Sequence, residues 1–151
     1  MLDIVSAENL PKSSGIERAL AVSLLKNFRM PKSQKEATAD ARMKGALLYS
    51  PSYEFDDGVY KDLAKGNGAV VFAFCDVLRE SGFRRGIVIS KMRLAFSSCR
   101  KAGCGFVVCS MAKNSEELRN GEELEAFMSA LGMNPHEKRF ASECSARLVG
   151  R

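Results

Sequence analysis

Two short apolar runs constrain the fold of this chain more than any other feature. They span residues 69–74 and 105–110, and nearly every position in them is apolar. Strands buried on both faces have this continuous pattern, whereas half-exposed strands alternate with polar residues. The segment between the runs is long enough to return the chain through a helix. The pair therefore predicts two parallel strands of an α/β protein.

Strand-like and helix-like segments alternate along the rest of the chain, which supports the same class. Two more strand candidates span residues 2–6 and 46–49. The expected helices begin at serines with capping-box spacing, at aspartates or beside a proline. They are a helix from Ser14 with Ile16, Leu20 and Leu24 on one face, an alanine-rich helix from Ser33 to about Met43, a short helix after Asp56 or Asp57, a turn of helix at 76–80, a basic helix at about 85–102, a helix with Leu124, Phe127, Met128 and Leu131 inward, and a last helix from Asn134.

Basic residues concentrate in one window of the chain. Between Arg79 and Lys101, seven of the eight charged residues are basic, so this window carries +6 while the whole chain carries +5. The window covers the helix expected between the two buried strands. A helix held between core strands would present these charges as a fixed surface, and the commonest partner of such a surface is a nucleic acid.

Composition narrows the remaining classes. The chain is 46% apolar and 27% charged, which is ordinary for a soluble globular protein, and no apolar run approaches the ~18 residues of a membrane span. Asp3 stands where a signal peptide would be basic, so we expect an intracellular protein without a membrane partner. The five cysteines lack Cys-x-x-Cys spacing and His136 is the only histidine. We therefore expect buried, reduced thiols, an exposed His136, and no metal or cofactor.

From about residue 42 onward, a series of short segments resembles one known family, ribonuclease P protein component 3, the thirty-kilodalton protein subunit of archaeal and eukaryotic ribonuclease P. The order and spacing of the segments carry the resemblance, since each is short. They are Leu48-Tyr49-Ser50-Pro51, Asp57-Gly58, Leu63-Ala64-Lys65, Asn67-Gly68, Asp76-Val77-Leu78, Gly82-Phe83-Arg84-Arg85, Ser90-Lys91-Met92-Arg93, Val107-Val108-Cys109-Ser110, Glu117-Leu118-Arg119 and Leu131-Gly132-Met133.

The resemblance implies a (β/α)-barrel protein without catalytic residues of its own. Members of the family help the ribonuclease P RNA to fold and to bind precursor tRNA, and the RNA performs the cleavage. They also pair with protein component 2 of the same enzyme. By this resemblance the chain acts in 5′-end maturation of precursor tRNA, in the cytoplasm or, in a eukaryote, in the nucleus.

The resemblance also places residues at the expected RNA interface. Basic residues of the family correspond to Arg84, Arg85, Lys91 and Arg93, with the first two expected just ahead of the helix, beside its positive N-terminal end. The full expected RNA-binding set, including the rest of the basic helix and the loop after residue 109, is Arg84, Arg85, Lys91, Arg93, Arg100, Lys101, Ser110, Lys113 and Arg119. In that loop Met111 replaces a family glycine, and Gly121 replaces a family proline.

Length limits how much of a barrel the chain can form. A complete (β/α)₈ barrel usually needs ~250 residues, whereas this chain has 151 residues and four or five strand candidates. We therefore expect a single α/β domain over 1–151, a partial or truncated TIM-like (β/α) barrel with parallel strands, whose N-terminal units are missing or divergent. A partial sheet has an open edge, which a helix, a partner subunit or a second copy would cover.

Two other functions remain open at this stage. One is a metal-dependent hydrolase on a related barrel, against which the scarcity of histidine and of strand-end carboxylates counts, because Asp76 is the single carboxylate there. The other is a degenerate family member that binds component 2 as a protein-interaction module without binding RNA. No residue pattern in the chain identifies a catalytic group.

Overall fold

The fold is α/β with parallel strands. The computed structural model describes residues 1–6, 16 and 18–149. Within these residues, six strands form two parallel sheets, β1–β2 and β3–β4–β5–β6, and neither sheet closes on itself. The strands are β1 (Leu2–Val5), β2 (Arg18–Ala21), β3 (Phe28–Arg29), β4 (Leu47–Leu48), β5 (Ala69–Ala73) and β6 (Gly105–Cys109); the helices are α1 (Gln34–Ala41), α2 (Asp57–Lys65), α3 (Phe74–Leu78), α4 (Gly82–Ala102), α5 (Gly121–Ala130) and α6 (Pro135–Val149).

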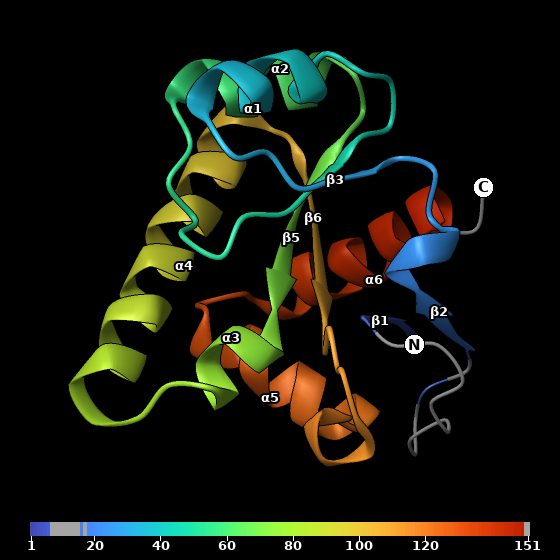
Figure 1. Ribbon diagram of the computed structural model, residues 1–151, viewed down its shortest axis with the longest axis vertical. Helices are drawn as coiled ribbons and strands as arrows, with labels where there is room; N and C mark the ends of the chain where they lie inside the picture. The colour runs from blue at the N-terminus through green and yellow to red at the C-terminus, as the bar shows by residue number, and fades with distance from the viewer. Residues whose placement is uncertain (7–15, 17, 150–151) are drawn as a thin grey trace.

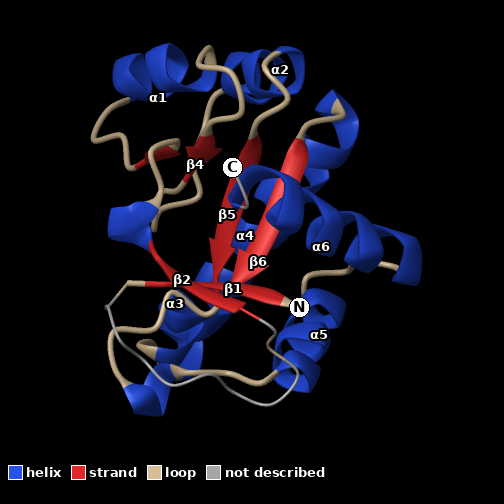
Figure 2. Ribbon diagram, turned by 90° about the vertical axis from the view of Figure 1, so that its right-hand side faces the viewer, coloured by secondary structure: helices blue, strands red, loops and turns tan. Residues whose placement is uncertain are grey.

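The two predicted buried strands form the centre of the molecule. Every residue of β5 and β6 is buried, and the strands pair in parallel from Ala69–Gly105 to Ala73–Cys109. Helices α3 and α4 connect them, and α4 and α6 lie on opposite sides of the two strands (Figure 1, Figure 2). Burial on both faces explains why neither strand alternates with polar residues.

Aromatic rings join the two sides of the sheet through its centre. Phe72 of β5 stacks on Tyr53 with the ring centroids 5.7 Å apart, and its edge meets Phe96 of α4. Phe96 contacts Phe106 of β6 at 5.0 Å, and Phe106 contacts Phe140 of α6 at 5.2 Å. These contacts tie α4 and α6 to the strands, so the exposed surface of α4 is fixed in place.

Strand β1 extends the strand order past β6. The Met111 N–H donates to the Ile4 carbonyl at 2.9 Å, and the Ser6 N–H donates to the Ala112 carbonyl at 2.8 Å. The sheet β1–β2 thus lies beside the chain that leaves β6, at the carboxyl ends of β5 and β6 (Figure 2).

The predicted helix around Ile16, Leu20 and Leu24 is wrong. Residues Arg18–Ala21 form β2, and Val22–Leu24 form a single 3-10 turn. Pairing with β1 over four positions, from Leu2–Arg18 to Val5–Ala21, overrides the local helical spacing. Ser14, the expected cap of that helix, lies outside the described residues.

The other predicted helices are confirmed, with small shifts in their ends. Ser33 caps α1, because its Oγ accepts the Glu36 N–H at 3.2 Å. The basic helix begins at Gly82 rather than at Arg85, because Ser81 is the extended residue before the first turn. Arg84 and Arg85 therefore lie within that first turn and not ahead of it. All five cysteines are buried, His136 is exposed, and no helix within the described residues is long and apolar enough to cross a membrane.

Candidate nucleic-acid interface

The basic residues of α4 lie on the sides and the outer face of a helix whose inner face is apolar. Met92, Ala95, Phe96 and Cys99 are buried against the sheet. Within Gly82–Ala102 there is no acidic residue. Any acid that neutralises a basic residue of α4 therefore comes from another element. The positions of those acids determine which basic residues of α4 remain available to a ligand.

Among the described residues, three of the seven basic residues in the window 79–101 are ion-paired. Arg79 contacts both carboxylate oxygens of Glu117, at 3.2 and 3.1 Å, and Arg100 contacts both of Glu137, at 2.7 and 3.1 Å. The Lys91 ammonium lies 2.7 Å from a carboxylate oxygen of Glu54.

These ion pairs compensate the positive charges of Arg79, Lys91 and Arg100, which the net charge of the window includes in full. Hydrogen bonding to Arg79 lowers the pKa of Glu117, and hydrogen bonding to Arg100 does the same for Glu137. Both acids are therefore ionised at neutral pH. Lys91 and Arg100, two members of the predicted RNA-binding set, are therefore neutralised by acids from other elements.

Arg85 and Arg93 are held differently, by backbone carbonyls at the ends of neighbouring helices. Arg85 Nε donates to the carbonyl of Val77, in the last turn of α3, at 3.1 Å, and to that of Glu80, just after α3, at 2.8 Å. Arg93 Nε donates to the carbonyl of Ala130, the last residue of α5, at 2.8 Å. Within the described residues the terminal Nη atoms of both side chains make no hydrogen bond or ion pair. Each guanidinium is therefore fixed by one nitrogen and keeps its other four N–H groups for a ligand.

The remaining cations of the predicted set vary in exposure. Arg84 and Lys101 are exposed and have no ion pair within the part of the chain that the structure describes. Lys113 is exposed, and its backbone N–H donates to Glu117 at 2.8 Å. Arg119 is half-buried: it donates to the carbonyls of Glu116 and Leu118, and its guanidinium lies 5.6 Å from the centre of the Phe74 ring.

Ser110 does not face solvent, so its predicted contact with RNA is wrong. It is fully buried, its N–H donates to Asp3 Oδ1 at 2.7 Å, and its hydroxyl donates to Asp3 Oδ2 at 2.6 Å. Burial raises the pKa of Asp3, although the hydrogen bonds from Ser110 oppose this. Ser110 thus joins β6 to β1, and the next residue, Met111, has a positive φ of 51°, in the left-handed region that favours glycine.

A polar cluster that the sequence did not indicate surrounds Asp76, just beyond the carboxyl end of β5. Tyr49 donates to both carboxylate oxygens of Asp76, at 2.9 and 3.0 Å, and Tyr53 donates at 2.6 Å. Burial and the negative Asp76 raise the pKa of both phenols, and burial raises the pKa of Cys75 to about 12. These tyrosines look like ordinary core aromatics in the sequence, so only the fold reveals the cluster. No group of three or more His, Cys, Asp or Glu within the described residues could hold a metal ion.

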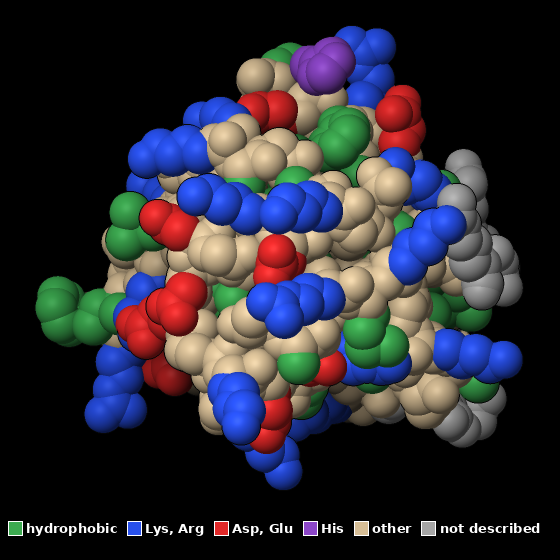
Figure 3. Space-filling view, turned by 90° about the horizontal axis from the view of Figure 1, so that it is seen from above, with side chains coloured by type: hydrophobic (Ala, Val, Ile, Leu, Met, Phe, Trp, Pro, Cys, Tyr) green, Lys and Arg blue, Asp and Glu red, His purple; other side chains and the backbone are tan. Residues whose placement is uncertain are grey.

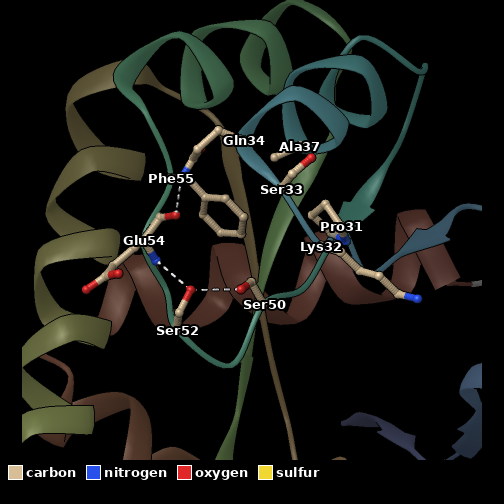
Figure 4. Close-up of a pocket in the computed structure, with 9 residues that line it drawn as sticks. All are labelled: Pro31, Lys32, Ser33, Gln34, Ala37, Ser50, Ser52, Glu54 and Phe55. Carbon is tan, nitrogen blue, oxygen red and sulfur yellow. Dashed lines mark hydrogen bonds between the residues drawn. The ribbon is translucent and has the colours of Figure 1, made fainter.

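A second polar region lies between the start of α1 and the chain that follows β4. Its cavity has a volume of about 260 Å³, and Ser33, Ser50, Ser52 and Glu54 are among its lining residues (Figure 4). The Lys32 N–H at the start of α1 already donates to Glu36, and Ser33 caps the helix. Glu36 and Ser33 thus already accept two of the N–H groups at this helix start, those of Lys32 and Glu36.

Basic and acidic side chains are interspersed on the face that carries α1 and α2 (Figure 3). That face offers no single basic patch, which leaves the anchored arginines of α4 as the strongest candidate contact for phosphate. Neither the models of known protein families nor the curated proteins give a match to this chain.

Proposed function

We propose that this chain is an RNA-binding accessory subunit of ribonuclease P, supporting the catalytic RNA in 5′-end maturation of precursor tRNA. The segment resemblance over residues 42–151 supports this function. The observation that carries it is the pair of guanidinium groups, Arg85 and Arg93, each anchored through Nε, with terminal nitrogens that make no hydrogen bond or ion pair in the described part of the chain. An arginine held in this way presents a fork that matches two oxygens of one phosphate.

Anchoring matters because it lowers the entropic cost of binding. A free arginine side chain loses about 2 kcal/mol of rotamer freedom when it is fixed, and Arg85 and Arg93 have already lost much of it on folding. The two residues are separated by about 12 Å along the helix, so they would contact phosphates that are not adjacent on one strand. Each contact releases about one counterion from the RNA.

The same proposal includes the fold and the partners. A partial TIM-like barrel is supported by the strand order β3–β4–β5–β6 and by the hydrogen bonds that continue it to β1. The partners would be ribonuclease P RNA, precursor tRNA and protein component 2, in the cytoplasm or the nucleus. The chemistry would lie in the RNA, since the protein supplies phosphate contacts.

A comparison of two double variants of equal charge tests the proposal. Arg85→Ala with Arg93→Ala removes the anchored forks, whereas Arg79→Ala with Arg100→Ala removes the same charge from ion pairs. Filter binding to transcribed ribonuclease P RNA should show about a tenfold or greater loss of affinity for the first variant and a several-fold smaller loss for the second. Equal losses would mean that only net charge matters, and no loss in either would exclude RNA contact by α4.

A further inference from the structure

A cavity of about 380 Å³ lies between α4, α2 and the loop that precedes α2. The aromatic residues Tyr53, Phe55 and Tyr60 line it together with Leu94 of α4. A cavity of this size, with an apolar lining and a few polar groups, is typical of small-molecule sites. It is therefore a candidate ligand site, and its charged lining residues determine which class of ligand fits.

Contacts within the chain hold the walls of this cavity in place. The Gln34 side chain bridges the loop before α2, since its Nε2 donates to the Glu54 carbonyl at 2.7 Å and its Oε1 accepts the Asp56 N–H at 3.3 Å. Phe55 and Tyr60 meet edge to face with their ring centroids 6.0 Å apart. Because folding already orders these walls, the entropic cost of binding a ligand between them is lowered.

The charged residues that line the cavity are Glu54, Asp56 and Lys91, two acids and one base, so the lining has a net negative charge. The Lys91 ammonium lies 2.7 Å from a Glu54 carboxylate oxygen, and these two charges compensate each other. Asp56 is exposed, its side chain makes no cap hydrogen bond to α2, and it has no ion pair within the described residues. The Asp56 carboxylate therefore remains available to a positively charged ligand.

The aromatic rings narrow the class of cation. An organic ammonium group is attracted both to a carboxylate and to the face of an aromatic ring, and the lining of this cavity offers both. A divalent metal ion needs several oxygen ligands, and no group of acidic residues suited to a metal ion exists in the described part of the chain. Leu94 adds an apolar contact, which suits the carbon body of an amine and not an inorganic ion.

We propose that the cavity binds a small organic cation, an ammonium group attached to an apolar body. Asp56 accepts hydrogen bonds from the ammonium group, and the rings of Phe55 and Tyr60 attract it. Leu94 contacts the apolar body. The proposal is independent of the RNA interface, because a carboxylate that attracts a cation repels phosphate.

Three ligands that share a benzene ring and differ in the attached group test the proposal on the full chain. They are phenethylammonium, phenylacetate and phenethyl alcohol, and a ligand-observed NMR titration measures the affinity of each. Phenethylammonium should bind about tenfold more tightly than the other two, since it alone adds an ion pair and a cation–π contact.

Two neighbouring aspartates provide matched variants. Asp56→Asn keeps the shape of the side chain and the preference for the N-cap position, and it should weaken phenethylammonium binding about fivefold. Asp57→Asn removes the same charge one residue further on, where the side chain lines a separate cavity with Lys61 and Lys101. It should change the affinity by less than about twofold.

A gain of affinity provides a test that a merely structural role would not meet. Lys91→Met removes the partner of Glu54 and makes the lining more negative, so phenethylammonium should bind several-fold more tightly at low salt. Unchanged or weaker binding in this variant would overturn the proposal.

The other outcomes are equally distinct. No binding of phenethylammonium, equal affinity for the three ligands, or equal losses in Asp56→Asn and Asp57→Asn would each overturn the proposal. Tighter binding of a lysine amide than of phenethylammonium would assign the cavity to a lysine side chain of another protein instead. Arg85→Ala with Arg93→Ala should leave amine binding intact, so the RNA proposal and this one can fail separately.

Discussion

Removing the Asp3 carboxylate should destabilise the fold where β1 joins β6. Asp3 is 1% exposed and accepts two hydrogen bonds from Ser110, at 2.7 and 2.6 Å. Hydrogen bonds to a charged group are worth about 1.5–3 kcal/mol each, and loss of the acceptor leaves a buried N–H unpaired. The alanine variant no longer has the desolvation cost of a buried carboxylate, and this offsets part of the lost stability. We expect Asp3→Ala to lower the free energy of unfolding by about 3 kcal/mol.

The isosteric variant provides the matched control. Asp3→Asn keeps an oxygen that can accept the Ser110 N–H and a nitrogen that can donate to its hydroxyl, so its cost should be about 1 kcal/mol. Urea unfolding measures the free energy of unfolding of both variants. For a chain of this size, a loss of 3 kcal/mol corresponds to a decrease of about 6–12 °C in Tm. The reasoning is refuted if Asp3→Ala costs under about 1 kcal/mol, or if Asp3→Asn costs as much as Asp3→Ala.

The pH dependence of this difference has a defined sign. Burial raises the pKa of Asp3 in the folded state. A raised folded-state pKa adds stability that is complete below the ordinary value of about 3.9 and is lost as the pH rises through the folded value. The stability of the wild type relative to Asp3→Asn should therefore be greatest at acid pH and decline above it. An increase with pH would show that the hydrogen bonds from Ser110 outweigh burial.

Three further predictions concern glycines, ion pairs and thiols. A Cβ on Gly105 would lie 2.8 Å from the Gly68 carbonyl oxygen, whereas one on Gly86 would meet no atom within 4 Å; Gly105→Ala should therefore cost about 2 kcal/mol or more, and Gly86→Ala should add about 1 kcal/mol, in urea unfolding. Glu117→Gln with Glu137→Gln frees Arg79 and Arg100, so RNA affinity should rise several-fold at low salt, and unchanged affinity would contradict an electrostatic interface. Because all five cysteines are buried and the pKa of Cys75 is raised to about 12, labelling by a thiol reagent at pH 8 should follow the rate of unfolding, and labelling much faster than unfolding would contradict the buried placement.

The central strands and the capped helices could be predicted because local sequence determines them. β6 coincides with its predicted run, since a continuous apolar segment has few ways to be buried. The periodic residues Leu124, Phe127 and Met128 are buried in α5 as expected. The region around β2 could not be predicted, because its strand conformation depends on pairing with β1, which the helical spacing of Ile16, Leu20 and Leu24 does not reveal.

The candidate site was harder to predict because its contacts are distant in sequence. Glu117 lies 38 residues from Arg79, and Glu137 lies 37 residues from Arg100, so a count of charges in one window could not include them. Ser110 finds its partner Asp3 across 107 residues. Arg85 and Arg93 are anchored by backbone carbonyls, and because every residue has a carbonyl, the sequence does not indicate which ones they contact. The sequence shows that basic residues cluster, whereas only the fold shows which of them have an acidic partner and which remain available to a ligand.

The salt dependence of RNA binding tests the central claim most directly. The affinity of the full chain for ribonuclease P RNA should fall linearly with the logarithm of salt concentration, with a slope proportional to the number of phosphate contacts. If Arg85 and Arg93 each hold a phosphate, Arg85→Ala with Arg93→Ala should reduce the magnitude of that slope by about 1.5 to 2, and Arg79→Ala with Arg100→Ala should change it by much less. A slope that both variants leave unchanged would contradict the claim that anchored arginines of α4 bind RNA.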